Sequence, residues 1–327
     1  MATIQDVARK AGVSTATVSR VLNNRDVVSK KTASKVDQAI QELNYAPNVL
    51  GRNLRISESR LLLVLIPSIV NSFYNEVIRG IEDIAIAQGY NLLLCETGSK
   101  PKRESIYMNL VRNRLADGII SMDPAVDKVR LKELAKNYPI VQCSEYDETG
   151  MISYVTIDSE LAAYQAVKYL IQIGHKEIGL INSDNKYLYA RERYEGYVRA
   201  LKEFDIPINS NWIYNIESIG FEEGQQAMKS LLGNTERPTA LFVVSDILAI
   251  GALKEINACA LNVPNDIALV GFDNIDLSKM SHPTLTTISQ PMYRMGNESA
   301  AMLINKIREK SVENTILSHE LVIREST

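Results

Sequence analysis

The sequence predicts an α/β protein with a separate helical N-terminal domain. Residues 1–60 hold capped stretches whose apolar positions recur at helical spacing, and from Leu61 onward short apolar runs alternate with amphipathic stretches. Charge divides the chain at the same place. Residues 1–60 contain ten Lys and Arg against five Asp and Glu, a net charge of +5, and the remainder has a net charge of −8. A basic N-terminal segment followed by an acidic remainder predicts that the N-terminal segment binds a polyanion.

The N-terminal stretch begins with two helix signals separated by a glycine. Thr3 and Asp6 have the spacing of a capping box, which predicts a short helix before Gly12. The glycine permits a tight turn, and Ser14 is placed to cap a second helix over residues 15–23. The second helix would therefore pack across the first.

A third helix is predicted after Ser29, with Val36, Ile40 and Leu43 along one side. Three short helices around a valine-rich core, with a glycine turn between the first two, predict a helix-turn-helix DNA-binding domain. The alternative is a small helical bundle that docks another protein.

The second helix would present small polar side chains to the major groove of double-stranded DNA. Thr15 and Ala16 lie at its N-terminal end, where side chains reach base edges, and Arg20 is suited to a guanine or a phosphate. Thr17 and Ser19 fit phosphate contacts or packing. The remaining candidate DNA contacts in this domain are Thr3, Ser14 and Asn23.

Residues 47–59 are predicted to form a hinge helix and linker. Asn48 is placed to cap a helix of at most about two turns, which is too short to be stable alone. Leu54 is the candidate apolar wedge for a minor groove, with Arg52 and Arg55 beside phosphates. A linker that merely spans two domains is the alternative.

The body of the chain is predicted to form two doubly wound lobes of parallel sheet. Its apolar runs are too numerous for one small sheet, and a strand–loop–helix pattern near the start of the body recurs after His175. We expect the chain to cross between lobes near Asp158, near Gln290 and near the C-terminal strand. The predicted domains are 1–46, 47–59 and 60–327, with lobe 1 at about 60–158 and 291–318 and lobe 2 at about 159–290 and 319–327.

The loops at the carboxyl ends of the strands should line a ligand cleft between the lobes. Their aromatic rings, carboxylates and single arginine suit a small polyhydroxylated ligand that bears a ring. Each has a structural alternative: the rings fit a core, Arg193 could pair with Glu192 or Glu195, and Asp246 could be a helix cap. The candidate residues are Ser68, Asn71, Phe73, Tyr74, Glu145, Tyr146, Arg193, Phe221, Asp246 and Asp273.

Signals of other protein classes are missing. The sequence has no GxxxxGK or GxGxxG loop and no nucleophile elbow, and its three histidines lack metal-ligand spacing. We therefore expect no enzyme activity, no cofactor and no metal. The polar start "MATIQDVARK" does not resemble a signal peptide, and no apolar run is long enough to span a bilayer, which predicts a cytoplasmic protein without a membrane partner.

Four stretches resemble the lactose/galactose repressor family over nearly the whole chain: "IQDVARKAGVSTATVSRVLNN", "ELNYAPNVLGRNL", "GHKEIGLI" and "VGFDNIDL…PTLTTISQP". The resemblance implies a homodimer on a near-palindromic DNA operator, with Leu54 of each hinge helix in the central minor groove. It also implies a core like that of periplasmic binding proteins, with a small effector between its lobes. Thr15, Ala16 and Arg20 fall on the family's base-reading positions.

The same resemblance implies roles in the core. Arg193 and Asp273 fall on positions that bind effector hydroxyl groups in the family. Three rings match places where a purine-binding member surrounds a base, which favours a nucleoside effector such as cytidine; they are Phe73, Tyr74 and Phe221.

Two positions depart from the family pattern. Tyr146 stands where the purine type has a tryptophan, and Ser245 replaces an asparagine of the lactose type. A sugar- or ribose-responsive regulator and a purine co-repressed regulator therefore stay open, as do an unrelated solute-binding protein and an enzyme. The sequence lacks a heptad tail after its last strand, which favours a dimer over a tetramer.

Overall fold

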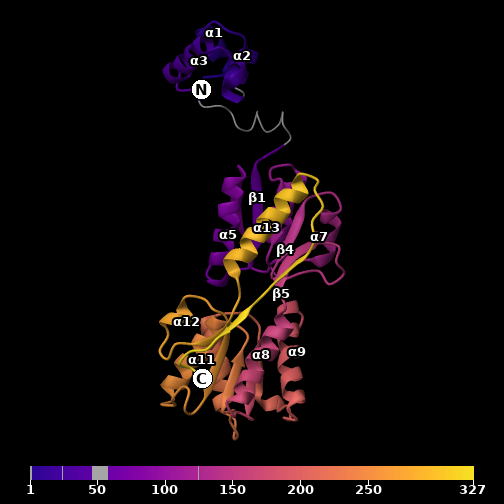
Figure 1. Cartoon of the computed structure of the whole chain (residues 1–327), viewed down its shortest axis with the longest axis vertical. Helices are drawn as coiled ribbons and strands as arrows, with labels where there is room; N and C mark the ends of the chain where they lie inside the picture. Colours follow the sequence, from indigo (N-terminus) through magenta and orange to yellow (C-terminus); the bar gives the residue numbers. More distant parts are fainter. Residues whose placement is uncertain (1, 24, 46–57, 124) are drawn as a thin grey trace. The chain divides into compact units, whose positions relative to one another are not determined.

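The computed structural model describes residues 2–23, 25–45, 58–123 and 125–327, in two units that divide between Ser59 and Arg60. The smaller unit contains α1 (Ile4–Ala11), α2 (Thr15–Asn23), a 3₁₀ turn (Arg25–Val27) and α3 (Lys30–Glu42), shown in indigo in Figure 1.

Local signals in the small unit form as the sequence predicts. Thr3 and Asp6 make a reciprocal capping box, and Gly12 ends α1 with φ of 65°, a left-handed conformation that favours glycine. The Thr17 amide donates to Ser14 Oγ at 3.1 Å at the start of α2. Helices α1, α2 and α3 each contribute a fully buried valine to one core, namely Val7, Val18 and Val36.

The larger unit holds two six-stranded sheets. The first has the order β11-β5-β4-β3-β1-β2, and all of its pairs are parallel. Its strands are β1 (Leu61–Ile66), β2 (Asn91–Glu96), β3 (Gly118–Ser121), β4 (Ile140–Cys143), β5 (Ser153–Ile157) and β11 (Thr315–Leu317).

The second sheet has the order β12-β10-β9-β8-β6-β7. One pair departs from the parallel pattern, because β12 runs antiparallel to β10 where the chain returns at its end. Its strands are β6 (Ile178–Ser183), β7 (Ile213–Ile216), β8 (Ala240–Val243), β9 (Ala268–Asp273), β10 (Thr286–Ser289) and β12 (Glu320–Val322).

Helices cover both faces of each sheet. In the first lobe, alternate residues of β1 show the division: Leu62 packs in the cluster that holds α5 and α13, and Leu63 packs in the cluster that holds α6 and α7. The helices of this lobe are α5 (Phe73–Ala87), α6 (Pro101–Arg112), α7 (Lys128–Ala135) and α13 (Met292–Ile307).

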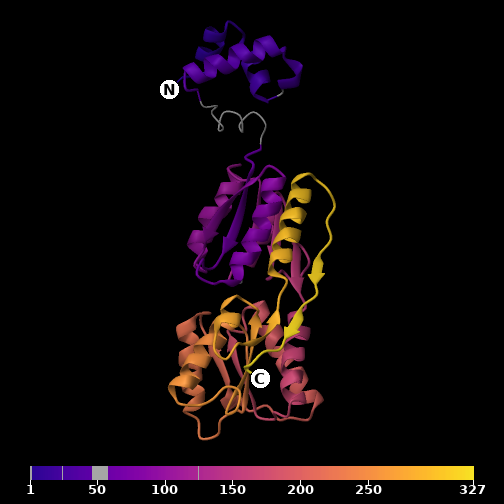
Figure 2. The ribbon, with the colours of Figure 1, turned by 60° about the vertical axis from the view of Figure 1, so that its left-hand side comes forward.

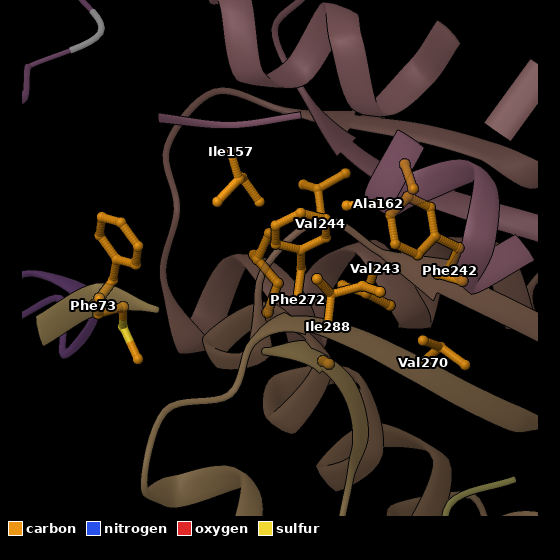
Figure 3. Close-up of a cluster of buried hydrophobic side chains, with 14 of the residues drawn as sticks. Phe73, Ile157, Ala162, Phe242, Val243, Val244, Val270, Phe272 and Ile288 are labelled. Atoms are coloured by element: carbon orange, nitrogen blue, oxygen red, sulfur yellow. The ribbon is translucent and has the colours of Figure 1, made fainter. Parts of the chain in front are cut away.

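The second lobe has a continuous apolar centre. Figure 3 shows Phe242 and Phe272, from the neighbouring strands β8 and β9, with ring centroids 6.3 Å apart. The other elements of this lobe are α8 (Ser159–Gln172), α9 (Leu188–Glu203), a 3₁₀ turn (Ser210–Trp212), α10 (Phe221–Leu232), α11 (Asp246–Ala258) and α12 (Leu277–Met280).

The chain passes between the two lobes three times. It leaves the first sheet after β5, at Asp158, and returns between β10 and α13, beside Gln290. The third passage joins β11 to β12, where Figure 2 shows the yellow C-terminal segment running from one lobe to the other. Both sheets are therefore built from segments distant in sequence.

Glycines let paired helices approach closely. A Cβ added at Gly296 of α13 would lie 2.0 Å from the carbonyl oxygen of Val77 on α5, and one added at Gly80 would lie 2.1 Å from that of Tyr293. Gly224 and Gly251 serve the same purpose between α10 and α11. In each case backbone, not a movable side chain, occupies the space.

We expect Gly296→Ala to destabilise the larger unit by about 1–3 kcal/mol, because two helix backbones must move apart. Urea unfolding followed by the fluorescence of Trp212, the single tryptophan, measures the change. Gly233→Ala is the matched control, since its added methyl would meet no atom closer than 3.4 Å. Equal unfolding midpoints for the two variants would contradict this account of the helix contact.

No helix in the described ranges is both long and apolar enough to cross a membrane.

Candidate functional site

Helix α2 has a buried face and an exposed polar face. Val18 and Val21 are buried in the core of the small unit, while Thr15, Ala16 and Arg20 are exposed. Small side chains at the start of the helix leave its backbone accessible, and the guanidinium stands one turn further on. This is the arrangement by which a recognition helix reads a major groove.

The other candidate DNA contacts of this unit have structural roles as well. Thr3 is exposed but its hydroxyl donates to Asp6 at 2.7 Å as part of the capping box, and the hydroxyl groups of Ser14 and Thr17 lie 2.9 Å apart. Ser19 is half-buried and Asn23 ends α2. The predicted hinge helix lies outside the described residues, together with Asn48, Arg52, Leu54 and Arg55.

A small inner cavity of about 40 Å³ lies between the two lobes of the larger unit. Six of the ten predicted effector residues line it: Asn71, Phe73, Tyr74, Glu145, Arg193 and Asp273. The cavity is also lined by six residues that were not predicted from the sequence as ligand contacts: Met122, Ser144, Tyr189, Ile219, Ser245 and Gln290.

Arg193 is the buried cation of the inner cavity. Its guanidinium carbon lies 3.6 Å from the centroid of the Phe272 ring, its Nη1 donates to the Val244 carbonyl, and the same nitrogen is 4.0 Å from Asp273 Oδ1. Its Nε has no hydrogen-bond partner. Burial lowers the pKa of Arg193, and the charge of Asp273 opposes that shift. The Nε–H group is thus available to a ligand acceptor.

Asp273 ends β9 and is held from two sides. Ser245 Oγ donates to its Oδ2 at 3.1 Å, and the amide of Gln290 donates to its Oδ1 at 2.7 Å. Gln290 lies where the chain passes from one lobe to the other, so this hydrogen bond links Asp273 to the segment that joins the lobes. Burial raises the pKa of Asp273 to about 6, and the charge of Arg193 limits the rise.

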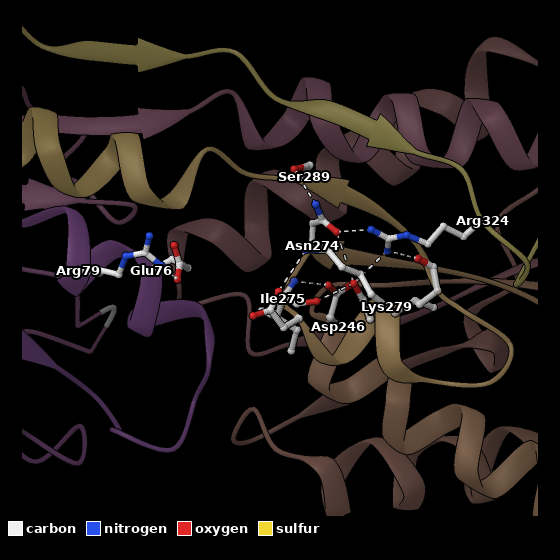
Figure 4. Close-up of polar contacts among 11 residues, drawn as sticks. Glu76, Arg79, Asp246, Asn274, Ile275, Lys279, Ser289 and Arg324 are labelled. Carbon is white, nitrogen blue, oxygen red and sulfur yellow. Dashed lines mark hydrogen bonds and ion pairs between the residues drawn. The ribbon is translucent and has the colours of Figure 1, made fainter.

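The backbone around Asp273 adopts positive φ angles, 116° at Asp273 and 61° at Asn274, which residues other than glycine rarely take. Figure 4 shows the side-chain contacts of this turn. Arg324 Nη2 donates to Asn274 Oδ1 at 2.5 Å, and the side-chain Nδ2 of Asn274 donates to Ser289 Oγ at 3.0 Å. A strained turn that the surroundings over-determine is typical of a ligand-binding position.

Glu145 brings a second buried carboxyl group to the cavity. Its Oε1 accepts from the Tyr189 amide of the other lobe at 3.0 Å, and its Oε2 has no partner. Burial raises the pKa of Glu145 to about 7, and the charges of Lys128 and Arg193 only partly offset this. The unpartnered oxygen is available to a ligand hydroxyl or amino group.

The raised pKa makes Glu145 a source of pH-dependent stability. The folded protein holds this proton up to about pH 7, while an exposed glutamate loses it near its ordinary pKa of 4.5, so stability falls as pH rises between these values. The shift corresponds to a loss of about 3 kcal/mol from pH 4 to pH 8. We expect urea unfolding to show this extra loss in the wild type and not in Glu145→Gln; parallel pH profiles would contradict it.

Four predicted effector residues do not line the inner cavity. Ser68 lines an adjoining outer pocket. Tyr146 stacks on Tyr154 with ring centroids 4.4 Å apart and donates to Glu192 at 2.6 Å, so Glu192 is not paired with Arg193 as the alternative had it. Phe221 begins α10, where its carbonyl meets Gly251.

Asp246 is fully buried at the start of α11 and serves the protein's own structure. It accepts from the Thr287 hydroxyl at 2.6 Å and from the Ile275 amide at 3.0 Å, as Figure 4 shows for Ile275. Burial, reinforced by the nearby charge of Asp273, raises its pKa well above the usual range. Its contacts shape the turn that presents Asp273.

Two family descriptions match the chain. Residues 3–48 match "Bacterial regulatory proteins, lacI family", and residues 167–327 match "Periplasmic binding protein-like domain". The HTH-type transcriptional repressor CytR of Escherichia coli strain K12 is 38% identical over 329 residues, covering 100% of this chain and 96% of that protein. The chain belongs to the LacI family. The family assignment made from sequence motifs is confirmed.

Other LacI-family proteins are similarly close. The HTH-type transcriptional repressor PurR of Photobacterium profundum is 34% identical over 100% of this chain and 98% of its own length. The structure of the lac repressor dimer bound to operator and the anti-inducer ONPF superposes with a TM-score of 0.89 at 28% identity, covering 99% of this chain and 98% of that one.

As a LacI-family member, the chain is a DNA-binding transcriptional repressor with a ligand-binding domain. Its relatives are repressors, not enzymes, which agrees with the sequence prediction. The predicted fold class is confirmed: an N-terminal helix-turn-helix domain followed by two sheets of mostly parallel strands. In the described ranges, no group of three or more His, Cys, Asp and Glu forms a candidate metal site.

Proposed function

We propose that this repressor is controlled by a nucleoside, with cytidine as the favoured effector. One observation carries the proposal: an aromatic pair and hydrogen-bonding charged groups converge on one cavity. The rings of Phe73 and Tyr74 are edge to face with centroids 5.2 Å apart, and Glu145, Arg193 and Asp273 line the same space. Rings suit a base, and carboxylates suit the hydroxyl groups of a ribose.

The similarity to CytR supports the choice of cytidine, as it exceeds the similarity to PurR over the same length of chain. A purine acting as co-repressor is the second candidate, because PurR is also close and the edge-to-face pair does not distinguish one base from another.

The mechanism we propose couples the lobes to the hinge. Residues of both lobes line the inner cavity, so an effector bound there would favour one angle between the lobes over others. In a homodimer a change in that angle separates the paired hinge segments and withdraws Leu54 from the operator. An effector that takes operator occupancy from nearly full to nearly empty must favour the non-binding state by about 5.5 kcal/mol.

Exposed apolar side chains support the homodimer. Leu93 and Leu94 of β2 are 38% and 43% exposed on an edge strand, and Met280 of α12 is 74% exposed. A bare apolar sheet edge is a site for association. We accordingly propose a two-fold symmetric dimer on a near-palindromic operator, acting in the cytoplasm, with the domain limits given by the sequence.

The test uses a duplex selected from random DNA by the full-length protein. We expect cytidine to weaken binding to this duplex at least about tenfold in a mobility-shift titration, while adenosine and ribose leave it unchanged. Tighter binding with guanine or hypoxanthine would instead favour the co-repressor candidate. A protein that selects no duplex at all would contradict the DNA-binding assignment.

A further inference from the structure

A larger outer pocket adjoins the inner cavity. It has a volume of about 380 Å³ and shares four lining residues with the cavity: Asn71, Tyr74, Tyr189 and Ile219. Both lobes contribute to it. A ligand too large for about 40 Å³ therefore has a formed space into which its remaining atoms can extend.

The outer pocket is acidic. Glu96, the last residue of β2, faces it from the first lobe, and Glu217, just after β7, faces it from the second. These are the edge strands of the two sheets, so one carboxylate stands on each side of the cleft. No lysine or arginine is among the described residues that line this pocket.

The remaining lining is suited to hydroxyl groups and rings. Ser183 Oγ has no hydrogen-bond partner, while the hydroxyl groups of Ser99 and Ser218 donate to Asp123 and Glu223 and can still accept from a ligand. The rings of Tyr187 and Tyr189 are nearly parallel, at 8°, with centroids 6.0 Å apart. Such a wall accepts an uncharged, hydroxyl-bearing group.

The inner cavity offers little to an anion in compensation. The guanidinium of Arg193 lies against the Phe272 ring, donates through Nη1 to the Val244 carbonyl and faces Asp273, so its positive charge is already partly balanced inside the protein. The buried Glu145 Oε2, which has no partner, calls for a ligand donor and not for a second anion.

We propose that the outer pocket is the second half of the effector site, that it takes an uncharged or cationic hydroxyl-bearing group, and that Glu96 and Glu217 exclude phosphorylated ligands. The inference rests on the proposed function for the identity of the ring, but the sign of charge follows from the pocket itself. The repressor would then respond to a nucleoside and not to the corresponding nucleotide.

The experiment compares neutral ligands with their phosphates by calorimetric titration of the full-length protein at pH 8. The pairs are cytidine and cytidine 5′-monophosphate, adenosine and adenosine 5′-monophosphate, and ribose and ribose 5-phosphate. For each neutral ligand that binds, we expect its phosphate to bind at least about 30-fold more weakly, because a like charge is placed against the two carboxylates.

The double variant Glu96→Gln, Glu217→Gln isolates the cause. We expect it to reduce the ratio of dissociation constants within a pair to below about fivefold. Glu133→Gln, an exposed change on α7 that removes one negative charge elsewhere, should leave the ratio as in the wild type. Circular dichroism checks that each variant is folded.

The outcomes separate this inference from the proposed function. A phosphate that binds as tightly as its neutral partner, or a ratio that the double variant does not change, overturns the inference even if cytidine binds. A further outcome is that ribose or adenosine binds while cytidine does not, and that the corresponding phosphate binds much more weakly. In that outcome cytidine is not the effector, but the charge selectivity of the outer pocket is supported. Binding by none of the six ligands contradicts both.

Discussion

Replacing Asp273 with alanine is expected to abolish the effector response while the protein still binds its operator. Asp273 accepts hydrogen bonds from Ser245 and Gln290 and faces Arg193, so its loss removes a ligand acceptor and the bond to the passage at Gln290. A hydrogen bond to a charged group contributes about 1.5–3 kcal/mol, which predicts at least a tenfold loss of effector affinity for one bond. The helix-turn-helix domain is a separate unit.

The measurement is a calorimetric titration with cytidine together with an operator titration of the same variant. Asp276→Ala is the matched control: its carboxylate lies three residues away, is 75% exposed and pairs with Lys279 at 3.1 Å. If cytidine still released the Asp273→Ala variant from DNA, Asp273 would not be part of the effector site.

Replacing Arg20 with alanine is expected to weaken operator binding about tenfold or more. Arg20 is exposed on the polar face of α2, behind Thr15 and Ala16. If it binds a guanine, the loss corresponds to about 1–3 kcal/mol and is confined to one base position. If it binds a phosphate, affinity falls uniformly across sequences and the salt dependence of binding decreases by about one charge.

Titrations of the selected operator and of duplexes with single base changes distinguish these roles. Lys35→Ala provides the control, because it removes one exposed positive charge from α3. Should the two variants lose the same small amount of affinity at every salt concentration, Arg20 would have no specific role.

The strands that the sequence predicted are those with continuous apolar runs. Strands β1, β6, β8 and β9 lie inside their sheets under helices on both faces, so their residues are almost all buried and the polar ones, Asn182, Ser183 and Asp273, stand at carboxyl ends. Strands such as β5, with sequence SYVTI, and β7, with sequence IYNI, carry no continuous apolar run, because Ser, Tyr and Asn interrupt it.

The same limit applies to the candidate site. Residues next to recognised strands, such as Glu145 after β4 and Asp273 at the end of β9, were found because strand ends meet at one edge of a sheet. Gln290 was noticed as a passage between lobes but not as a ligand contact, since β10 has the pattern of a polar stretch. The burial of Asp246 depends on Thr287, 41 residues away, and no local signal reports it.

The family of the chain is established, but its effector is not decided by similarity to its relatives. The repressors CytR and PurR match this chain at 38% and 34% identity, so identity alone does not choose between their effectors. Direct titration with the candidate effectors therefore has to decide.

The most direct test of nucleoside control is a calorimetric titration of the full-length protein with cytidine, with uridine, adenosine, ribose and galactose for comparison. We expect saturable binding of cytidine that Asp273→Ala abolishes, and little or no heat from ribose and galactose alone. Binding confined to a sugar or to adenosine, with none to cytidine, would contradict it.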